Sequence, residues 1–257
     1  MGDPHMTPDQ LLEAWHDQQT AFIEFREMRT RTMVRVLAHL QSGLDHPIRV
    51  LDLACGPASL ATEVLAAIPG ASAVGVDRDP VLLRLAKETN QFGERLQIVD
   101  ADITDPTLPE QLGGRIFDAA ISATALHWLD PGELVSLYQH LPRMLVDGGV
   151  FLNADHLYYD QRTQAGLDAL AVSLRDSFQV NHMEQGAMSW DDWWQAATTM
   201  PGWEKDAQRR QQVWANDHPT VKVSTGFHLA ALQAAGFIET DQIYQWFDDR
   251  IIFGRLA

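Results

Sequence analysis

The feature that most constrains the fold of this chain is a series of short apolar runs between residues 49 and 157, each followed by turn or polar residues. Stretches of helical pattern separate the runs. Continuous apolar runs of this length are typical of parallel strands buried on both faces, with helices as the crossovers between them. The predicted strands are Val50–Leu53, Ala73–Val76, Leu96–Val99, Phe117–Ile121 and Val150–Leu152.

Helical patterns flank this region on both sides. Apolar residues recur at three- and four-residue steps from Thr7 to His39, and Thr7 followed by Pro8 suits the start of a helix. Residues 160–225 are helical or irregular in pattern and rich in tryptophan, and most of these tryptophans are expected to form the core of a helical cap. The tryptophans are Trp190, Trp193, Trp194, Trp203 and Trp214.

The end of the chain predicts a last helix and a pair of strands. Phe227–Gly236 has a helical pattern that ends at a glycine. Gln242–Phe247 and Ile251–Leu256 alternate as strands do, and a tight turn at Asp248-Asp249 would make them an antiparallel hairpin.

Charge and cysteine content narrow the classes of partner. The formal net charge is -16, and nucleic-acid binding depends on Lys and Arg that neutralise phosphates. We therefore expect a small-molecule partner rather than a nucleic acid. The single cysteine, Cys55, excludes an intrachain disulfide and fits a reducing cytoplasm. No apolar run approaches the roughly 20 residues needed to span a bilayer, and no secretion signal is visible, so we expect no membrane association.

The strongest local signal is the segment Val50–Leu60, in which a strand enters a turn of small residues and then a helix. Small residues let a ligand approach the backbone, and the helix offers free N–H groups. A second strand ends at Asp77, 21 residues after Gly56, where a carboxylate can accept hydrogen bonds from both ribose hydroxyls. A nicotinamide dehydrogenase shares this geometry, but its fingerprint needs three glycines, and Ala54 and Ala58 flank Gly56 here.

This segment resembles motif I of class I S-adenosylmethionine (SAM)-dependent methyltransferases, whose usual form is Asp-x-Gly-x-Gly-x-Gly. The later segments resemble that family in the same order, over residues 49–156. They are Val76-Asp77 for the ribose-binding acid, Asp100–Ile103 for the adenine motif, Phe117–Leu129 for the fourth-strand motif of small-molecule methyltransferases, and Leu141–Gly149 for the helix and turn before strand five.

The resemblance implies the fold, the cofactor and the domain organisation. We expect an α/β, Rossmann-like, doubly wound, mostly parallel seven-stranded sheet with a C-terminal antiparallel hairpin and a helical cap. The cofactor is expected to be SAM. We assign residues 1–6 to a tag remnant, 7–46 to an N-terminal helical lid, 47–157 to the SAM-binding core, 158–225 to a helical cap insertion, and 226–257 to the last helix and the strands that complete the core.

The resemblance also implies roles for single residues at the cofactor. Asp77 would bind the ribose and Asp102 the adenine, although each could instead cap a strand end or a turn. Asp52 would hold the glycine turn or the cofactor ammonium. Arg29, which shares a helical face with Arg26, would contact the cofactor carboxylate; the alternative is a solvated face. Further cofactor positions are Ala54, Gly56, Arg78, Ile103 and Ala123, while Cys55 is expected to be a small spacer.

On the acceptor side, His127 follows the fourth strand at the edge where ligands bind. It is the candidate general base for an acceptor that must lose a proton, and the alternative is that it packs against or orients the cofactor. The acceptor pocket is expected to include Trp15, Trp128, Asp155 and His156. A metal site formed by Asp155, His156, His218 and His228 is conceivable. Separate hydrogen bonds explain these residues better, so no metal is expected.

The resulting hypothesis is a cytoplasmic SAM-dependent methyltransferase that moves a methyl group to an O, N or C atom of a small metabolite. One alternative is a SAM enzyme that modifies tRNA or nucleotides, which the acidity of the chain disfavours. Another is a SAM-binding subunit that acts on a partner without catalysis, and binding of NAD would indicate a dehydrogenase. The apolar N-terminal helix could also form a homodimer contact.

Overall fold

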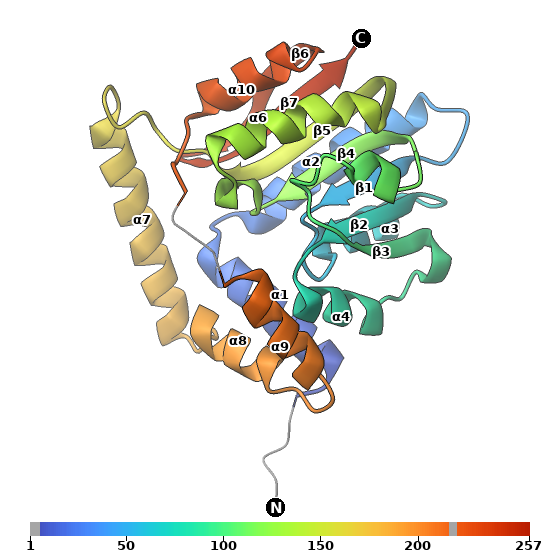
Figure 1. Ribbon diagram of the computed structural model, residues 1–257. Helices are drawn as coiled ribbons and strands as arrows, with labels where there is room; N and C mark the ends of the chain where they lie inside the picture. Colours follow the sequence, from blue (N-terminus) through green and yellow to red (C-terminus); the bar gives the residue numbers. More distant parts are fainter. Residues whose placement is uncertain (1–5, 216–219) are drawn as a thin grey trace, which may run out of the picture.

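The computed structural model describes residues 6–215 and 220–257, which form one seven-stranded sheet with helices on both faces (Figure 1). The strand order is β3-β2-β1-β4-β5-β7-β6, and β7 runs in the opposite direction to the other six strands. This confirms the predicted fold class. The strands are β1 Arg49–Leu53, β2 Ser72–Asp77, β3 Leu96–Asp100, β4 Phe117–Ala123, β5 Leu145–His156, β6 Phe237–Trp246 and β7 Asp249–Leu256.

The order of the strands reverses between β1 and β4, which is where open parallel sheets bind ligands at their carboxyl ends. Buried residues divide into one apolar cluster on each face of the sheet. The helices α2 Arg26–Ser42, α3 Ser59–Ala67 and α4 Pro80–Glu88 contribute to one cluster. The helices α5 Leu108–Gln111, α6 Pro131–His140 and α10 Thr225–Ala234 contribute to the other.

The N-terminal segment is two helices and not the single continuous helix that its spacing predicts. Helix α1 spans Pro8–Phe22, and Thr7 caps it together with Gln10, as the Thr7-Pro8 signal indicates. The chain breaks before α2, and Phe25 adopts a left-handed backbone with φ of 59°. No glycine or proline marks this break, so the apolar spacing alone could not reveal it.

Two strands are longer than predicted. β5 begins at Leu145 because the Gly148-Gly149 pair, which interrupts the apolar pattern, lies inside the strand. β6 begins at Phe237, and its polar residues at an exposed sheet edge hide the strand pattern. The C-terminal hairpin is confirmed, with its turn one residue earlier, at Phe247-Asp248.

The tryptophan-rich region forms the helices α7 Ala165–Glu184, α8 Trp190–Thr198 and α9 Glu204–Val213. Helices α8 and α9 lie beside α1 and α4 below the sheet in Figure 1, and α7 runs along one side of the molecule. Trp193 and Trp203 are fully buried in a third apolar cluster with Leu11 and Leu85. These two tryptophans are therefore core residues of a helical cap. None of the helices in the described ranges combines the length and the apolar character needed to cross a bilayer.

Candidate active site

The two residues on which the cofactor prediction depends lie in direct contact. The Gly56 amide donates a hydrogen bond to Asp77 Oδ2 at 2.8 Å, and the Asp79 amide donates to Asp77 Oδ1 at 2.8 Å. Strands β1 and β2 are neighbours, with Leu53 opposite Val76. The turn after β1 and the end of β2 therefore meet at one edge of the sheet. The contact of Asp77 with a ribose stays a prediction.

The turn after β1 repeats one unusual backbone conformation. Ala54, Gly56 and Ala58 have φ values of 52°, 55° and 60°, which lie in the left-handed region. These are the three positions to which the usual motif assigns glycine. An L residue with a Cβ atom loses about 1–2 kcal/mol in this conformation. The chain therefore keeps the backbone shape of the motif at an energetic cost at the two alanines.

This cost gives a first prediction. Replacing Ala54 with glycine should raise the free energy of unfolding by about 0.5–1 kcal/mol, because relief of strain exceeds the added entropy of the unfolded chain. Ala58→Gly is the matched comparison, since Ala58 is fully buried and loss of its methyl group offsets the gain. Urea denaturation measures both variants. A lower stability of Ala54→Gly would contradict this account of the turn.

Two buried carboxylates face the turn. Asp52 Oδ2 accepts a hydrogen bond from the Ala61 amide at 3.1 Å, at the start of α3. Burial raises the pKa of Asp52 to about 8, and the charge of Asp77 adds to the increase. Burial also raises the pKa of Asp77 to about 6, against the backbone hydrogen bonds that it accepts. This donor and acceptor set fits SAM, whose ribose hydroxyls are donors and whose ammonium and sulfonium groups are cations.

At the end of β3, Asp102 is tied to its own turn and to Arg78. Its Oδ1 accepts from the Thr104 amide at 2.8 Å, and Arg78 Nη1 donates to its Oδ2 at 3.1 Å. The Arg78 guanidinium lies 4.4 Å from the centre of the Trp214 ring. Asp102 is therefore placed at the sheet edge beside β2, as predicted, but its contact with adenine stays a prediction, as does that of the buried Ile103.

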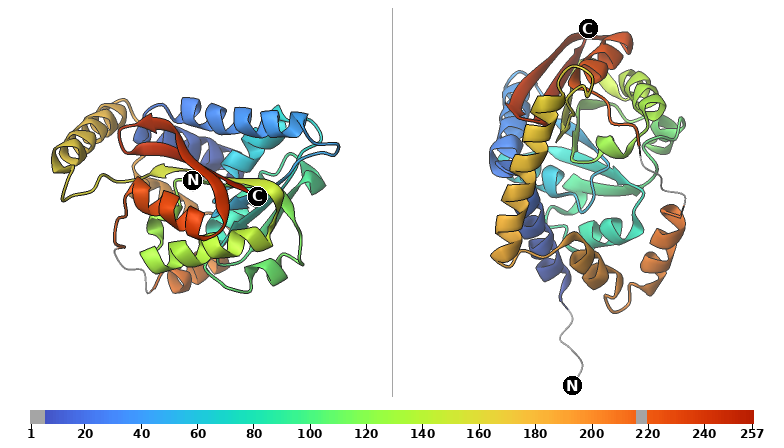
Figure 2. Two further views of the ribbon diagram at one scale, coloured as in Figure 1. Left: turned by 90° about the horizontal axis from the view of Figure 1, so that it is seen from above. Right: turned by 90° about the vertical axis from the view of Figure 1, so that its left-hand side faces the viewer.

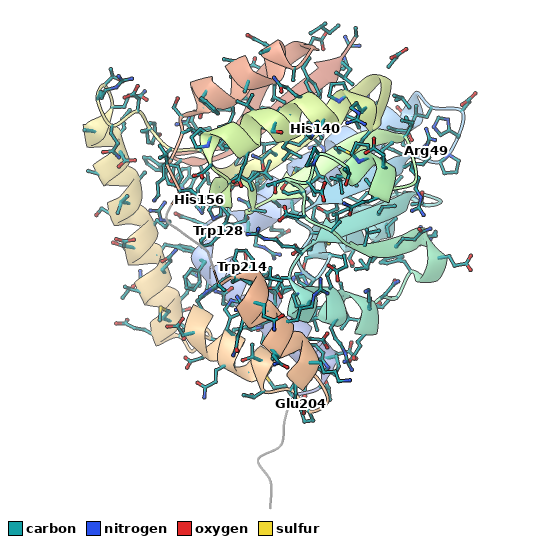
Figure 3. All side chains as sticks on the ribbon, in the orientation of Figure 1. Arg49, Trp128, His140, His156, Glu204 and Trp214 are labelled. Carbon is teal, nitrogen blue, oxygen red and sulfur yellow. The ribbon has the colours of Figure 1, made fainter. Side chains whose placement is uncertain are left out.

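Trp214 is a residue that the sequence did not single out for the cofactor site. It follows α9, and its Nε1 donates to Asp79 Oδ2 at 2.9 Å. Figure 3 labels it on the side of the sheet that faces α9. Trp214 thus covers the end of β2 from the cap. The richness of this region in tryptophan was the only signal for it.

Arg29 is buried, so the alternative of a solvated face is wrong. Its Nη1 donates to Asp249 Oδ1 at 2.5 Å and its Nη2 to Thr124 Oγ1 at 2.6 Å. Thr124 follows Ala123, the last residue of β4. Arg29 therefore ties α2 to the ends of β4 and β7, and its predicted contact with the cofactor carboxylate is not tested.

Arg26, one helical turn before Arg29, has no carboxylate partner among the described residues. Its Nη2 lies 3.5 Å from His16 Nδ1. Burial lowers the pKa of Arg26 to about 10, and the charge of Arg29 adds to the decrease. A half-buried guanidinium with no ion pair to a described carboxylate is stabilised by an anionic ligand, so Arg26 joins Arg29 as a candidate for the cofactor carboxylate.

Trp15 lies on the cofactor side of the molecule. Its ring centre is 4.7 Å from that of Trp193, and a Cβ atom placed on Gly56 would come within 4.0 Å of Trp15 Cζ2. The sequence placed Trp15 in the acceptor pocket, whereas the structure places it over the glycine turn.

His127 and Asp155 form a hydrogen-bonded pair at the ends of β4 and β5. The His127 Nδ1 atom lies 2.6 Å from Asp155 Oδ1, and the His127 amide donates to Asp155 Oδ2 at 3.0 Å. Burial raises the pKa of Asp155, but the charge and hydrogen bond of His127 outweigh it and hold the pKa at about 2. Because the carboxylate is ionised, Nδ1–H donates to it and Nε2 is left to accept a proton.

A cavity adjoins this pair, lined by His127, His156, Tyr158, Lys222, Val223 and His228. Trp128 is 47% exposed, with its ring centre 5.2 Å from that of His127. The ring of His228 is held by a contact within the protein, because its Nδ1 lies 2.7 Å from the Tyr138 hydroxyl. Burial lowers the pKa of His228 to about 4. Figure 3 labels Trp128 and His156 on the side of the sheet that faces α7 and α9.

The conceivable metal site does not assemble within the described ranges. No group of three or more His, Cys, Asp or Glu residues that could hold a metal ion occurs in residues 6–215 and 220–257. His218 lies outside the described residues.

Residues 50–149 match the family model described as a methyltransferase domain, and the strand order is that of the expected Rossmann-like sheet. These residues form a class I SAM-dependent methyltransferase domain. The methyltransferase domain contains Gly56, Asp77 and His127, while Asp155 lies just beyond it.

Curated relatives agree with this assignment. A trans-aconitate 2-methyltransferase of Azoarcus sp. strain BH72 is 31% identical over 150 residues, which cover 58% of this chain and 54% of that protein. A malonyl-[acyl-carrier protein] O-methyltransferase of Legionella pneumophila is 27% identical over 118 residues, 46% of this chain and 39% of that protein. The chain thus spans about half the length, or less, of these curated relatives.

One solved structure shows the same fold over the full length of the chain. Magnesium protoporphyrin IX methyltransferase from Synechocystis PCC 6803 with bound SAH aligns with a TM-score of 0.55, covering 100% of this chain and 90% of that one at 15% identity. At this identity the likeness concerns the fold alone.

Proposed function

We propose that the protein transfers a methyl group from SAM to a hydroxyl or amine group of a small molecule, with His127 as the general base. The observation that carries the proposal is the contact between Gly56 and Asp77 at the carboxyl ends of β1 and β2, beside the reversal of strand order, in a methyltransferase domain. The name of the Azoarcus relative, a trans-aconitate 2-methyltransferase, supports a small acceptor.

The residues of the chain have to bind and orient SAM and the acceptor, and to remove a proton from the acceptor. When bound, SAM supplies a methyl group already activated by its sulfonium, so no covalent enzyme intermediate is needed. Asp77 would accept the ribose hydroxyls, Asp52 would hold the turn or the cofactor ammonium, and Arg26 with Arg29 would face the carboxylate. His127 Nε2 would take the proton of the acceptor while Asp155 holds the ring and stabilises its positive charge.

The His127–Asp155 pair favours an acceptor that must lose a proton over one that is already ionised. A carboxylate acceptor needs no base at neutral pH, whereas a hydroxyl or amine does. A buried carboxylate that fixes one imidazole tautomer is the arrangement that proton removal requires, since it leaves Nε2 as an acceptor. The atom methylated is therefore proposed to be oxygen or nitrogen.

The cofactor assignment is tested by Asp77→Ala. We expect the Kd for SAM to rise about 100-fold, because two hydrogen bonds to an ionised acceptor are lost at about 1.5 kcal/mol each or more. Titration calorimetry measures the Kd, with the fully exposed Asp45→Ala as control. Since the pKa of Asp77 is about 6, SAM affinity of the parent chain should also fall below that pH. Unchanged affinity in Asp77→Ala would overturn the proposed function.

A further inference from the structure

A second cavity, which we call the α7 groove, lies between α7, the end of α1 and the β6–β7 turn. It encloses about 350 Å³, including space open to solvent. Its apolar wall includes Phe22, Ala171, Leu174 and Phe178, and its polar side includes Arg175, Asp248 and Asp249. The two views of Figure 2 show α7 running alongside the molecule as an outer element.

The α7 groove adjoins the candidate catalytic pocket, and one residue belongs to the lining of both. His156, the last residue of β5, lines both the α7 groove and the cavity at His127. The ring centres of His127 and His156 are 6.4 Å apart. The α7 groove and the cavity at the proposed base are therefore separated by little more than the His156 side chain.

The inner face of α7 is apolar and only partly covered. Leu167, Leu170 and Leu174 follow three- and four-residue spacing, so they share the face on which Ala171 and Phe178 line the groove. They are 45%, 46% and 39% exposed. An apolar face left open beside a catalytic pocket is typical of a binding surface.

The rim of the α7 groove is aromatic and locally strained. Phe25 and Trp246 have ring centres 4.9 Å apart, and they are 51% and 38% exposed. Phe25 and Phe247 both have positive φ, at 59° and 50°. Bulky residues in this conformation are rare, and such strain gathers at binding and active sites.

The polar side of the α7 groove selects against anions and offers one unpaired acceptor. Among its described lining residues, Arg175 is paired with Asp248 at 2.5 Å. Glu24 accepts a hydrogen bond from Trp246 Nε1. Asp249 is paired with Arg29 through Oδ1, while its buried Oδ2 has no hydrogen-bond partner within residues 6–215 and 220–257. A ligand carboxylate would find both neighbouring guanidiniums, Arg175 and Arg29, already paired and would lie near Glu24, whereas a hydroxyl would complete the hydrogen bonding of Asp249.

We propose that the α7 groove binds the body of the methyl acceptor, and that this acceptor is an uncharged, largely apolar molecule that carries a hydroxyl group. The proposal rests on the proposed function for the reaction at His127, and it adds the class of substrate. It differs from a polycarboxylate acceptor, because the two guanidiniums beside the groove, Arg175 and Arg29, are already paired with Asp248 and Asp249.

The test uses two probes of the same ring size, 2-naphthol and 2-naphthoate, titrated into the whole chain by calorimetry. We expect 2-naphthol to bind about tenfold more tightly than 2-naphthoate. Leu174→Glu, which places a charge in the apolar wall, should weaken the binding of 2-naphthol at least about tenfold. Val172→Glu is the matched control, because Val172 is 37% exposed on the same helix and does not line the groove. It should change the affinity less than about twofold.

Each other outcome overturns the proposal in a recognisable way. Equal binding of the two probes, or equal losses in both variants, would remove the groove as the selective site. A dimer of the parent chain that Leu174→Glu dissociates, without 2-naphthol binding, would make the groove an interface between copies. SAM titrations on the same samples separate the two proposals: normal SAM binding without a 2-naphthol response refutes the groove alone. No SAM binding to the parent chain refutes the proposed function and leaves the probe result to decide the groove.

Discussion

His127→Ala should lower kcat by about 10²- to 10⁴-fold, the usual contribution of a positioned general base, while the Kd for SAM changes less than about threefold. The physical reason is the geometry of the His127–Asp155 pair. Asp155 is buried and ionised and lies 2.6 Å from Nδ1, so Nε2 is left as the proton acceptor of a side chain that lines the cavity. The rate is measured as transfer of labelled methyl to any member of a panel of phenols and aliphatic alcohols that the parent chain methylates.

A purely structural role of His127 would give a different pattern. If His127 removes the acceptor proton, the rate of His127→Ala with a phenol should recover as the pH rises toward the phenol pKa, because the acceptor then ionises unaided. Asp155→Asn should also lower kcat, since the imidazolium formed during transfer loses its counter-charge. His39→Ala, at the exposed end of α2, is the control for removing a histidine. A defect of His127→Ala that stays constant with pH, or that appears as weaker SAM binding, would contradict the base assignment.

The sequence was most informative where local pattern and ligand geometry coincide. The runs that ended at Leu53 and Val76 placed Gly56 and Asp77 at one sheet edge, and the structure joins them by a hydrogen bond. A parallel strand buried on both faces appears in the sequence as a continuous apolar run, which is easy to recognise. The carboxyl ends of neighbouring parallel strands lie at the same edge of the sheet. For the same reason His127 and Asp155, which follow neighbouring strands, could be placed on one side of the sheet.

The pairing of His127 with Asp155 and the α7 groove could not be derived in the same way. Whether Asp155 faces His127 or the opposite side of the sheet depends on the register of β5, which begins five residues before the predicted Val150. The α7 groove joins segments far apart in the chain, at Phe22, Leu174 and Asp248. No local period encodes such a contact, because it depends on the packing of the cap against the sheet edge.

The contribution of Arg29 to the stability of the fold could not be predicted from the sequence either. The sequence placed it on a helical face with Arg26, but only the folded chain shows its ion pair with Asp249, in which the side chains are 3% and 6% exposed. Arg29→Met should lower the free energy of unfolding by about 3–5 kcal/mol, because it leaves Asp249 buried without its counter-charge. Arg35→Met, an exposed position on the same helix, should change stability by less than about 0.5 kcal/mol.

The pH dependence of Arg29→Met gives a second readout. Burial raises the pKa of Asp249, and the charge of Arg29 opposes that increase. Without Arg29 the folded-state pKa rises further above the unfolded value, so the stability of the variant is fullest at low pH and is lost as the pH rises through the folded-state pKa. The deficit measured by denaturation should therefore be larger at pH 8 than at pH 5. It should shrink when Asp249→Ala is added, since no unpaired buried charge then remains. A deficit that is independent of pH, and unchanged in the double variant, would mean that Arg29 stabilises the fold by packing alone.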